Sequence, residues 1–308
     1  MNILISGSLA YDRIMDFPGR FADHILPEKI HILNVCFTVN GLQERFGGTA
    51  GNIAYTLSLL GEKPEILATC GRDFDNYRQW LESLSLSLGG IRPIAEEFTA
   101  SAYITTDLAD NQITGFNPGA MKFPSNHSFD GLIPDDTLAI ISPGNTQDMI
   151  TYSRNYKERG IDYICDPGQQ IPVIPPEDLA EMIQGAKILV SNDYELDLIQ
   201  KHTGRSNTDL LGQTGSVITT LGEEGSVLRS GETEDHVAAA SPSTVTDPTG
   251  AGDAFRAGLI KGLVSGEDLV KSAQMGSVAA SFAVEVLGTQ EHRLTPEQFW
   301  RRFDEAFK

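Results

Sequence analysis

Short apolar runs rich in β-branched residues alternate with helical patterns along most of this chain of 308 residues. The runs that predict strands are ILISG at 3–7, LAIIS at 138–142, YICD at 163–166, ILVSN at 188–192 and SVITT at 216–220. Strands separated by helices build a parallel sheet that helices cover on both faces. We therefore predict one α/β domain over residues 1–308, with ligands bound at the carboxyl ends of its strands.

Two early regions interrupt this alternation. Residues 12–46 and 98–117 contain strand-like segments such as VCFTVNGLQERF, with no helical pattern between them. These segments indicate an antiparallel patch beside the main sheet. Because both regions adjoin candidate site residues, we predict a small β-sheet lid over the ligand edge of the main sheet. An edge hairpin without a lid function is the alternative.

The charge of the chain limits its partners. Lys and Arg number 23 and Asp and Glu number 42, which gives a formal net charge of −19 at pH 7. Such a surface repels nucleic acid and anionic membranes, so a polyanionic ligand must be bound by local features. The first residues, MNILISGSLAYD, have no basic start, and their apolar run is too short for a signal peptide or a membrane span. We expect a cytoplasmic protein that binds neither nucleic acid nor membrane.

The stretch DPTGAGDAFRAG at 247–258 predicts an anion site. Its glycines precede a helical pattern, and a helix start without bulky side chains leaves its free N–H groups accessible to an anion. Asp253 lies where that anion would bind. A carboxylate there is unusual for binding alone, but phosphoryl transfer needs a group that accepts the proton of the attacking hydroxyl. On its own, this motif is more often an ordinary glycine-rich helix start with a capping acid.

A second glycine-rich turn, FGGTAGN at 46–52, also continues into a helical pattern. Glycine lets a ligand approach the backbone, and Asn52 offers both a donor and an acceptor to hydroxyl groups. Together with Asp12, just past the first strand, this turn is a candidate site for a sugar diol. Either polar residue alone is also a common helix cap or turn former.

Two further motifs follow strands in the second half of the chain. In SNDYE, Asn192 and Glu195 are one helical turn apart, so an amide and a carboxylate share one face. Such oxygen groups suit Mg²⁺, usually through water, and a helix cap with a solvated glutamate is the alternative. TTLGEEG ends the next strand in a turn that Gly222 and Gly225 open to close approach. The chain has no GxxxxGK[ST] or GxGxxG motif, which disfavours a P-loop enzyme and a dinucleotide site.

The order of these motifs resembles that of the ribokinase-like (PfkB) family of sugar and nucleoside kinases. It runs from GG…N near the N-terminus through NxxE and TLGxxG to DxTGAGDAF near the C-terminus, and so covers nearly the whole chain. The resemblance implies a three-layer α/β sandwich whose mostly parallel central sheet lies between helices and carries a small β-sheet lid. Thr49 stands where ribokinases carry a lysine, and Pro248 stands where many relatives have threonine. The missing lysine weakens an assignment to a free sugar.

The resemblance also implies a role for each motif. The residues implied in catalysis are the base Asp253 and the N–H groups of Gly250, Ala251 and Gly252. Those implied along ATP are Asn192, Thr220, Gly222 and Gly225, with Asn192 and Glu195 organising Mg²⁺ through water. Those implied at the ribose or sugar hydroxyls are Asp12, Gly48 and Asn52.

Within the family, SLAYDRIM, FGGTAGNIAY, ITTDLADNQITGFNPGAM and CDPGQ are most similar to the prokaryotic adenosine and nucleoside kinases. Lid residues of those enzymes contact the base. The corresponding candidates in this chain are Tyr103, Gln112, Phe116 and Met121, and Gln169 is the candidate for a hydrogen bond to the edge of the base. Each of them could instead serve only to pack the lid.

The implied activity is ATP-dependent phosphorylation of the 5′-hydroxyl of a nucleoside, adenosine first and other purine nucleosides next, as in purine salvage. Mg²⁺ and a monovalent cation such as K⁺ are the candidate ions, and a homodimer is a candidate assembly. The alternatives are a sugar kinase that acts on ribose, fructose or a related sugar, and a non-catalytic sensor that binds a nucleoside. The intact Asp253 counts against a sensor, because a sensor needs no base.

Overall fold

The computed structural model describes the backbone of residues 1–308 and every side chain except that of residue 28. Nine strands form the main sheet, in the order β13-β12-β11-β10-β9-β8-β1-β4-β5. Their bounds are β1 (Asn2–Ser6), β4 (Glu65–Cys70), β5 (Ile91–Pro93), β8 (Thr137–Ile141), β9 (Asp162–Cys165), β10 (Ile188–Asn192), β11 (Ser216–Thr220), β12 (Ser226–Ser230) and β13 (Thr233–Val237). Every neighbouring pair from β11 to β5 is parallel, whereas β12 runs antiparallel to both β11 and β13. The predicted parallel sheet is confirmed.

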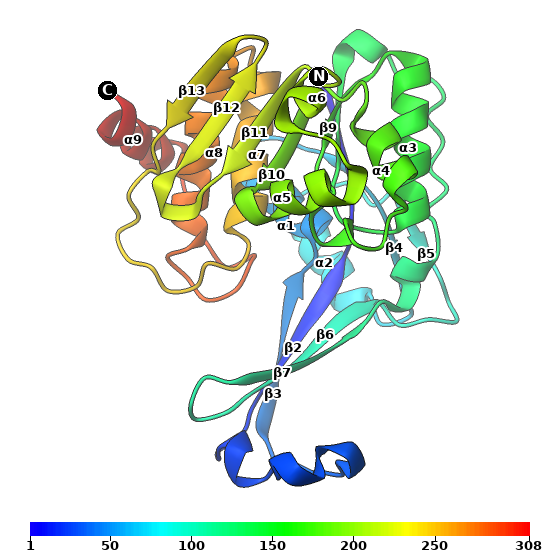
Figure 1. Cartoon of the computed structure of the whole chain (residues 1–308), viewed down its shortest axis with the longest axis vertical. Helices are drawn as coiled ribbons and strands as arrows, with labels where there is room; N and C mark the ends of the chain where they lie inside the picture. Colours follow the sequence, from blue (N-terminus) through cyan, green and yellow to red (C-terminus); the bar gives the residue numbers. More distant parts are fainter.

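Helices cover both faces of this sheet (Figure 1). One face carries α1 (Thr49–Leu59), α2 (Asp75–Ser83), α7 (Ala251–Val264) and α8 (Leu269–Ala283). The other face carries α3 (Thr146–Arg159), α4 (Pro176–Ile183), α5 (Asp193–Thr203) and α6 (Asn207–Leu211). The last helix, α9 (Pro296–Phe307), packs against α8. The three layers are those of the predicted sandwich.

Two hydrophobic cores lie on either side of the sheet, because successive side chains of a strand point to opposite faces. In β10, Ile188 and Val190 pack in the core under α1 and α7, and Leu189 packs in the core under α3 and α4. In β1, Ile5 and Leu4 divide in the same way. A strand buried on both faces is apolar at most positions, which explains the nearly continuous apolar runs in the sequence.

A second sheet extends away from the main one and forms the predicted lid (Figure 1). Its order is β3-β2-β6-β7, with β2 (Ala10–Asp16), β3 (Asn40–Gly47), β6 (Ala100–Thr106) and β7 (Gln112–Asn117). The pairs β2/β3 and β6/β7 are antiparallel, as expected, but β2 and β6 pair in parallel. Both of these strands start at buried alanines beside the main sheet and run outward, so the lid is mixed rather than antiparallel throughout.

The outer end of the lid differs from the prediction. The strand expected from residue 35 begins only at Asn40, and the segment before it contains the short 3₁₀ helices η1 (Phe21–Asp23) and η2 (Pro27–Ile32). Phe17, Phe21 and Phe37 pack against one another there. Within the described residues, no helix combines the length and the apolar character that crossing a bilayer requires.

The two-core arrangement predicts that two leucines contribute very differently to the free energy of unfolding. We expect Leu189→Ala to lower the free energy of unfolding by about 2–5 kcal/mol, because Leu189 is fully buried in the central strand β10. Leu108→Ala serves as the control, since 70% of Leu108 is exposed in the lid, and we expect it to change stability by about 0.5 kcal/mol or less. Urea unfolding measures both values. Equal losses in the two variants would contradict the core position of Leu189.

Candidate active site

A cleft of about 830 Å³ opens where the parallel strands end, in the size range of small-molecule sites. Its wall includes one residue that ends or follows each of five strands of the main sheet: Ser8, Pro143, Asp166, Asn192 and Thr220. The predicted site residues that line it are Asp12, Gly48, Asn52, Phe116, Met121, Gln169, Asn192, Glu195, Thr220, Gly222, Gly250, Ala251, Gly252 and Asp253. Motifs that are far apart in the chain therefore meet at one edge of the sheet.

Asp253 lies in the first turn of α7 and faces the cleft. Asn52, in the first turn of α1, donates from Nδ2 to Asp253 Oδ2 at 2.8 Å. Burial raises the pKa of Asp253 to about 6, although the Asn52 hydrogen bond and the nearby Arg256 both act to lower it. A carboxyl group with this pKa is ionised at pH 7 and can still accept a proton, which suits a general base.

The start of α7 provides N–H groups for an anion. Gly250 precedes the helix and no side chain caps it. Ala251 N–H donates to Pro248 O at 3.2 Å, so this predicted anion donor is already used within the turn. Within the described residues, the N–H groups of Gly250 and Gly252 donate to no protein acceptor. The helix dipole adds positive potential at the same place, so an anion is favoured beside Asp253.

A buried ion pair that the sequence analysis missed supports this end of the cleft. Arg256 Nε and Nη2 donate to the two carboxylate oxygens of Asp166 at 2.5 and 2.6 Å, and both side chains are buried. Arg256 Nη1 also donates to Gly252 O at 3.1 Å, and Nη2 lies 4.0 Å from Glu195 Oε2. Burial alone would lower the pKa of Arg256, but the Asp166 carboxylate outweighs it and raises that pKa.

Two signals in the sequence could have identified this pair. Asp166 directly follows β9, at the edge of the sheet where ligands bind. Arg256 lies within the apolar pattern of α7, and a buried arginine requires a partner of opposite charge.

The acceptor side of the cleft contains Asp12, Gly48 and Thr49. Burial raises the pKa of Asp12, the nearby Arg45 lowers it and Asp247 raises it further. Gly48 has a φ of +89°, and a Cβ at this position would lie 2.5 Å from Ser8 O, so only glycine fits. Thr49 Oγ1 donates to Pro143 O at 2.7 Å, which fixes this turn to the end of β8.

Asn192 and Glu195 form a helix cap at the start of α5. Asn192 Oδ1 accepts from Glu195 N–H at 2.7 Å, and Glu195 Oε2 accepts from Asn192 N–H at 2.9 Å. The capping alternative therefore accounts for one oxygen of each side chain. Within the described residues, no protein hydrogen bond uses Glu195 Oε1, and no cluster of three or more His, Cys, Asp and Glu could hold a metal. This donor set fits a Mg²⁺ ion held mainly by phosphates and water rather than by a protein cage.

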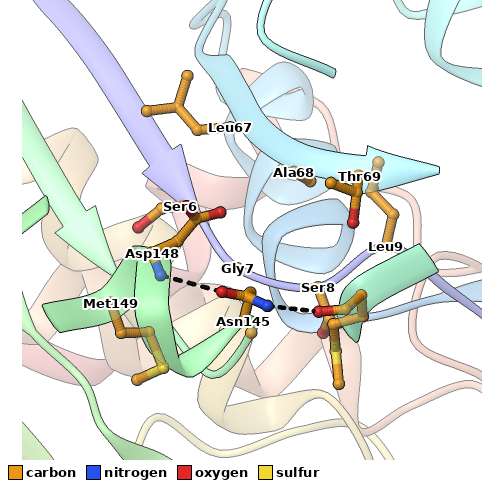
Figure 2. A pocket seen from close by; sticks show the side chains of 12 residues that line it. Ser6, Gly7, Ser8, Leu9, Leu67, Ala68, Thr69, Asn145, Asp148 and Met149 are labelled. Carbon is orange, nitrogen blue, oxygen red and sulfur yellow. Dashed lines mark hydrogen bonds between the residues drawn. The ribbon is translucent and has the colours of Figure 1, made fainter. Parts of the chain in front are cut away.

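A small pocket of about 10 Å³ lies behind the cleft and shares Ser8 and Met121 with it. Figure 2 shows its wall, formed by the ends of β1 and β4 and the start of α3. Asn145 accepts from Asp148 N–H at 3.0 Å and donates to Met121 O at 2.9 Å. Asn145 thus caps α3 and holds the backbone of Met121, a candidate contact of the base. The pocket has room for about one water molecule.

Three predicted site residues do not line the cleft. Tyr103 and Gln112 lie farther out on the lid, where the Tyr103 hydroxyl accepts from Arg13 at 2.8 Å and Gln112 is exposed. Gly225 closes the turn before β12, and a Cβ there would lie 2.0 Å from Val237 O. The structure thus gives a packing reason for Gly225, and its contact with the nucleotide stays a prediction.

The sequence model described as pfkB family carbohydrate kinase matches residues 19–296. The chain belongs to this family. The resemblance found in the sequence is therefore confirmed.

Individual relatives are similar over nearly the whole chain. The nucleoside kinase of Methanocaldococcus jannaschii is 30% identical over 280 residues, which cover 90% of this chain and 91% of the relative. The nucleoside kinase of Burkholderia thailandensis in complex with inosine is 36% identical with a TM-score of 0.85, covering 99% of this chain and 98% of that chain. The same enzyme in complex with ADP-inosine is 38% identical with a TM-score of 0.84, covering 99% and 96%.

The buried ion pair of this family member generates a stability prediction. We expect Asp166→Asn to lower the free energy of unfolding by about 3–5 kcal/mol, because it leaves the buried charge of Arg256 without its partner. Glu181→Gln is the control, since it removes a partner of the exposed Arg154, and we expect it to cost less than about 1 kcal/mol. Urea unfolding at pH 7 measures both. A loss at Asp166 no larger than the loss at Glu181 would contradict the role of the pair.

Proposed function

We propose that the chain phosphorylates the 5′-hydroxyl of a purine ribonucleoside with ATP, and that residues 1–308 act as one kinase domain with its lid. Adenosine and inosine are the first acceptors to test. The carrying observation is that Asp253, with its raised pKa, lies beside free N–H groups at the start of α7. The names of the relatives support a nucleoside acceptor, and the ADP-inosine complex supports an adenine nucleotide as the other substrate.

In the proposed reaction the 5′-oxygen attacks the γ-phosphorus of ATP, the bond to the β–γ bridging oxygen breaks, and ADP leaves. Asp253 accepts the proton of the 5′-hydroxyl and later releases it to water. The N–H groups of Gly250 and Gly252 stabilise the charge on the transferring phosphoryl group. Arg256 holds Gly252 O by a hydrogen bond, which keeps this turn in position.

On the donor side, Asn192, Thr220 and Gly222 lie along the nucleotide in this proposal. Glu195, through Oε1, and Asn192 would hold Mg²⁺ by way of water. When bound, this ion neutralises phosphate charge. Stimulation by a monovalent cation and pairing into a homodimer stay predictions from the family resemblance, which K⁺ titration and sedimentation would test.

On the acceptor side, Asp12 accepts hydrogen bonds from the ribose 2′,3′-diol. Gly48 lets the sugar approach the backbone, and Asn52 lies between this site and Asp253. Phe116, Met121 and Gln169 line the same cleft and are the proposed contacts of the base. Closure of the lid would add Tyr103 and Gln112 and exclude water from the reacting groups.

An acceptor series tests the proposed substrate class. We expect ADP release to be fastest with adenosine or inosine, slower with cytidine, and slow with free ribose or fructose. We expect kcat/KM for a 2′-deoxynucleoside to be roughly ten- to hundredfold lower, because the Asp12 carboxylate would lack the 2′-hydroxyl as a hydrogen-bond partner. Fastest turnover with a free sugar would replace the nucleoside proposal by the sugar-kinase alternative. Absence of turnover together with tight nucleoside binding would favour a sensor.

The Asp12 carboxylate provides a residue-level test of the same diol site. We expect Asp12→Ala to weaken nucleoside kcat/KM by roughly ten- to hundredfold, since hydrogen bonds to a charged group contribute about 1.5–3 kcal/mol. The KM for ATP should remain near that of the wild type. Asp16→Ala, at the exposed outer end of the same strand, is the matched control and should leave both constants unchanged. An effect of Asp12→Ala on ATP alone would move Asp12 out of the acceptor site.

The assigned base predicts a pH profile. Asp253 acts only when it is deprotonated, so kcat should rise as the pH increases through about 6 and should level off above it. We expect Asp253→Asn to lower kcat by at least roughly 10²-fold while nucleoside and ATP binding, measured by calorimetry, stay nearly intact. Turnover near that of the wild type with the same pH profile would show that another group is the base.

A further inference from the structure

A chain of side-chain amides connects Asp253 to the interior behind the cleft. Asn52 donates from Nδ2 to Asp253, and Asn52 Oδ1 accepts from Gln290 Nε2 at 3.1 Å. Gln290 Nε2 also donates to the Tyr77 hydroxyl at 2.6 Å, and Gln290 Oε1 accepts from the Trp80 indole N–H at 2.9 Å. Asn52, Gln290 and Tyr77 are all buried. These residues come from α1, from α2 and from the segment between α8 and α9.

Both outer ends of this chain have a fixed hydrogen-bond polarity. The indole N–H of Trp80 can only donate, so the oxygen of the Gln290 amide must face it. The Tyr77 hydroxyl donates to the backbone carbonyl of Gly47 at 2.8 Å, and a carbonyl can only accept. The phenol oxygen is therefore left to accept from the Gln290 NH₂ group. Each of the two contacts favours the same orientation of Gln290, and the two together fix it.

The orientation of Gln290 is passed on to Asn52. With the Gln290 NH₂ group directed at it, Asn52 has to present Oδ1 to Gln290 and Nδ2 to Asp253. Gly51 leaves the space for this contact, since a Cβ there would lie 1.9 Å from the Tyr77 hydroxyl and 3.0 Å from Gln290 Nε2. An amide that was free to rotate could instead offer its oxygen to a protonated Asp253.

We propose that Gln290 and Trp80 are positioning residues for Asp253, because they fix the Asn52 amide so that it always presents an N–H group to this carboxylate. The significance for catalysis rests on the proposed function, in which Asp253 is the base. Fixing the amide denies the protonated carboxyl group a hydrogen-bond acceptor and so favours the ionised form. Loss of the constraint should therefore raise the pKa of Asp253.

Trp80→Phe tests this step with little change in packing. Phenylalanine keeps an aromatic ring between Phe46 and Tyr55, which both stack on Trp80, and removes only the indole N–H group and part of the ring area. Trp300→Phe is the matched control, because Trp300 lies on α9 at the surface and packs against Phe299 and Phe303. Both variants keep the same titratable and charged groups near Asp253, which are Arg256, Asp166, Glu195 and the phenol of Tyr77.

The measurement is the titration of the Asp253 carboxyl carbon by ¹³C NMR in the ligand-free chain, assigned with Asp253→Asn. We expect Trp80→Phe to raise the pKa of Asp253 by about 0.5 to 1 unit, within the size of one hydrogen bond to a charged group. The acid limb of the kcat profile should move to higher pH by the same amount. Trp300→Phe should change neither quantity. An unchanged pKa in folded Trp80→Phe, or an equal shift in Trp300→Phe, would overturn the proposal.

Gln290→Met separates the amide route from general packing. This variant removes the link itself, so it should raise the pKa of Asp253, and adding Trp80→Phe to it should cause no further shift. A further shift in the double variant would mean that Trp80 acts through packing, and a Gln290→Met variant without a shift would overturn the proposal. A shifted pKa in a chain without nucleoside kinase activity would keep this inference and reject the proposed function. Nucleoside kinase activity together with an unshifted pKa of Asp253 in the variants would keep the proposed function and reject this inference.

Discussion

The hydrogen bond between Asn52 and Asp253 joins the starts of α1 and α7, which are 201 residues apart in the sequence. Both helices pack on the same face of the main sheet, and both begin at its carboxyl edge. This contact brings the candidate acceptor site and the candidate anion site within reach of one carboxylate. If either helix shifted along the sheet by one turn, about 5 Å, Asp253 would lose the hydrogen bond from Asn52. The two candidate sites would then no longer share this carboxylate.

The cleft is lined by acidic residues in a chain that is itself strongly acidic. The chain carries a formal net charge of −19, and Asp12, Asp166, Glu195 and Asp253 all line the cleft. Binding of ATP in the proposed reaction therefore depends on local positive potential, which comes from the start of α7 and from Arg256. Much of the Arg256 charge is already compensated by Asp166, so this arginine mainly holds the turn. A metal ion bound with the donor would supply the remaining compensation.

Two local signals predicted most of the cleft, because glycine-rich helix starts and the carboxyl ends of parallel strands meet at one edge of the sheet. Glycine-rich helix starts indicated Asp253 and Asn52, and positions after predicted strands indicated Glu195 and Asp12. Gln290 and Trp80 follow no strand and belong to no motif, and they reach the site only through packing between segments far apart in the chain. A periodic pattern carries no information on which buried amide faces which carboxylate, so sequence reasoning had no signal for either residue.

By itself, the sequence determined the order of strands and helices, the two-sided burial of the main sheet and the positions of its glycine-rich turns, because these depend on local residue patterns. The tertiary structure alone decided how these pieces meet. It paired β2 with β6 in parallel, turned Arg256 toward Asp166, and used the oxygens of Asn192 and Glu195 for a helix cap. It also raised the pKa of Asp253 through burial. Burial and hydrogen-bond geometry arise from contacts between distant segments, and those contacts exist only once the chain has folded.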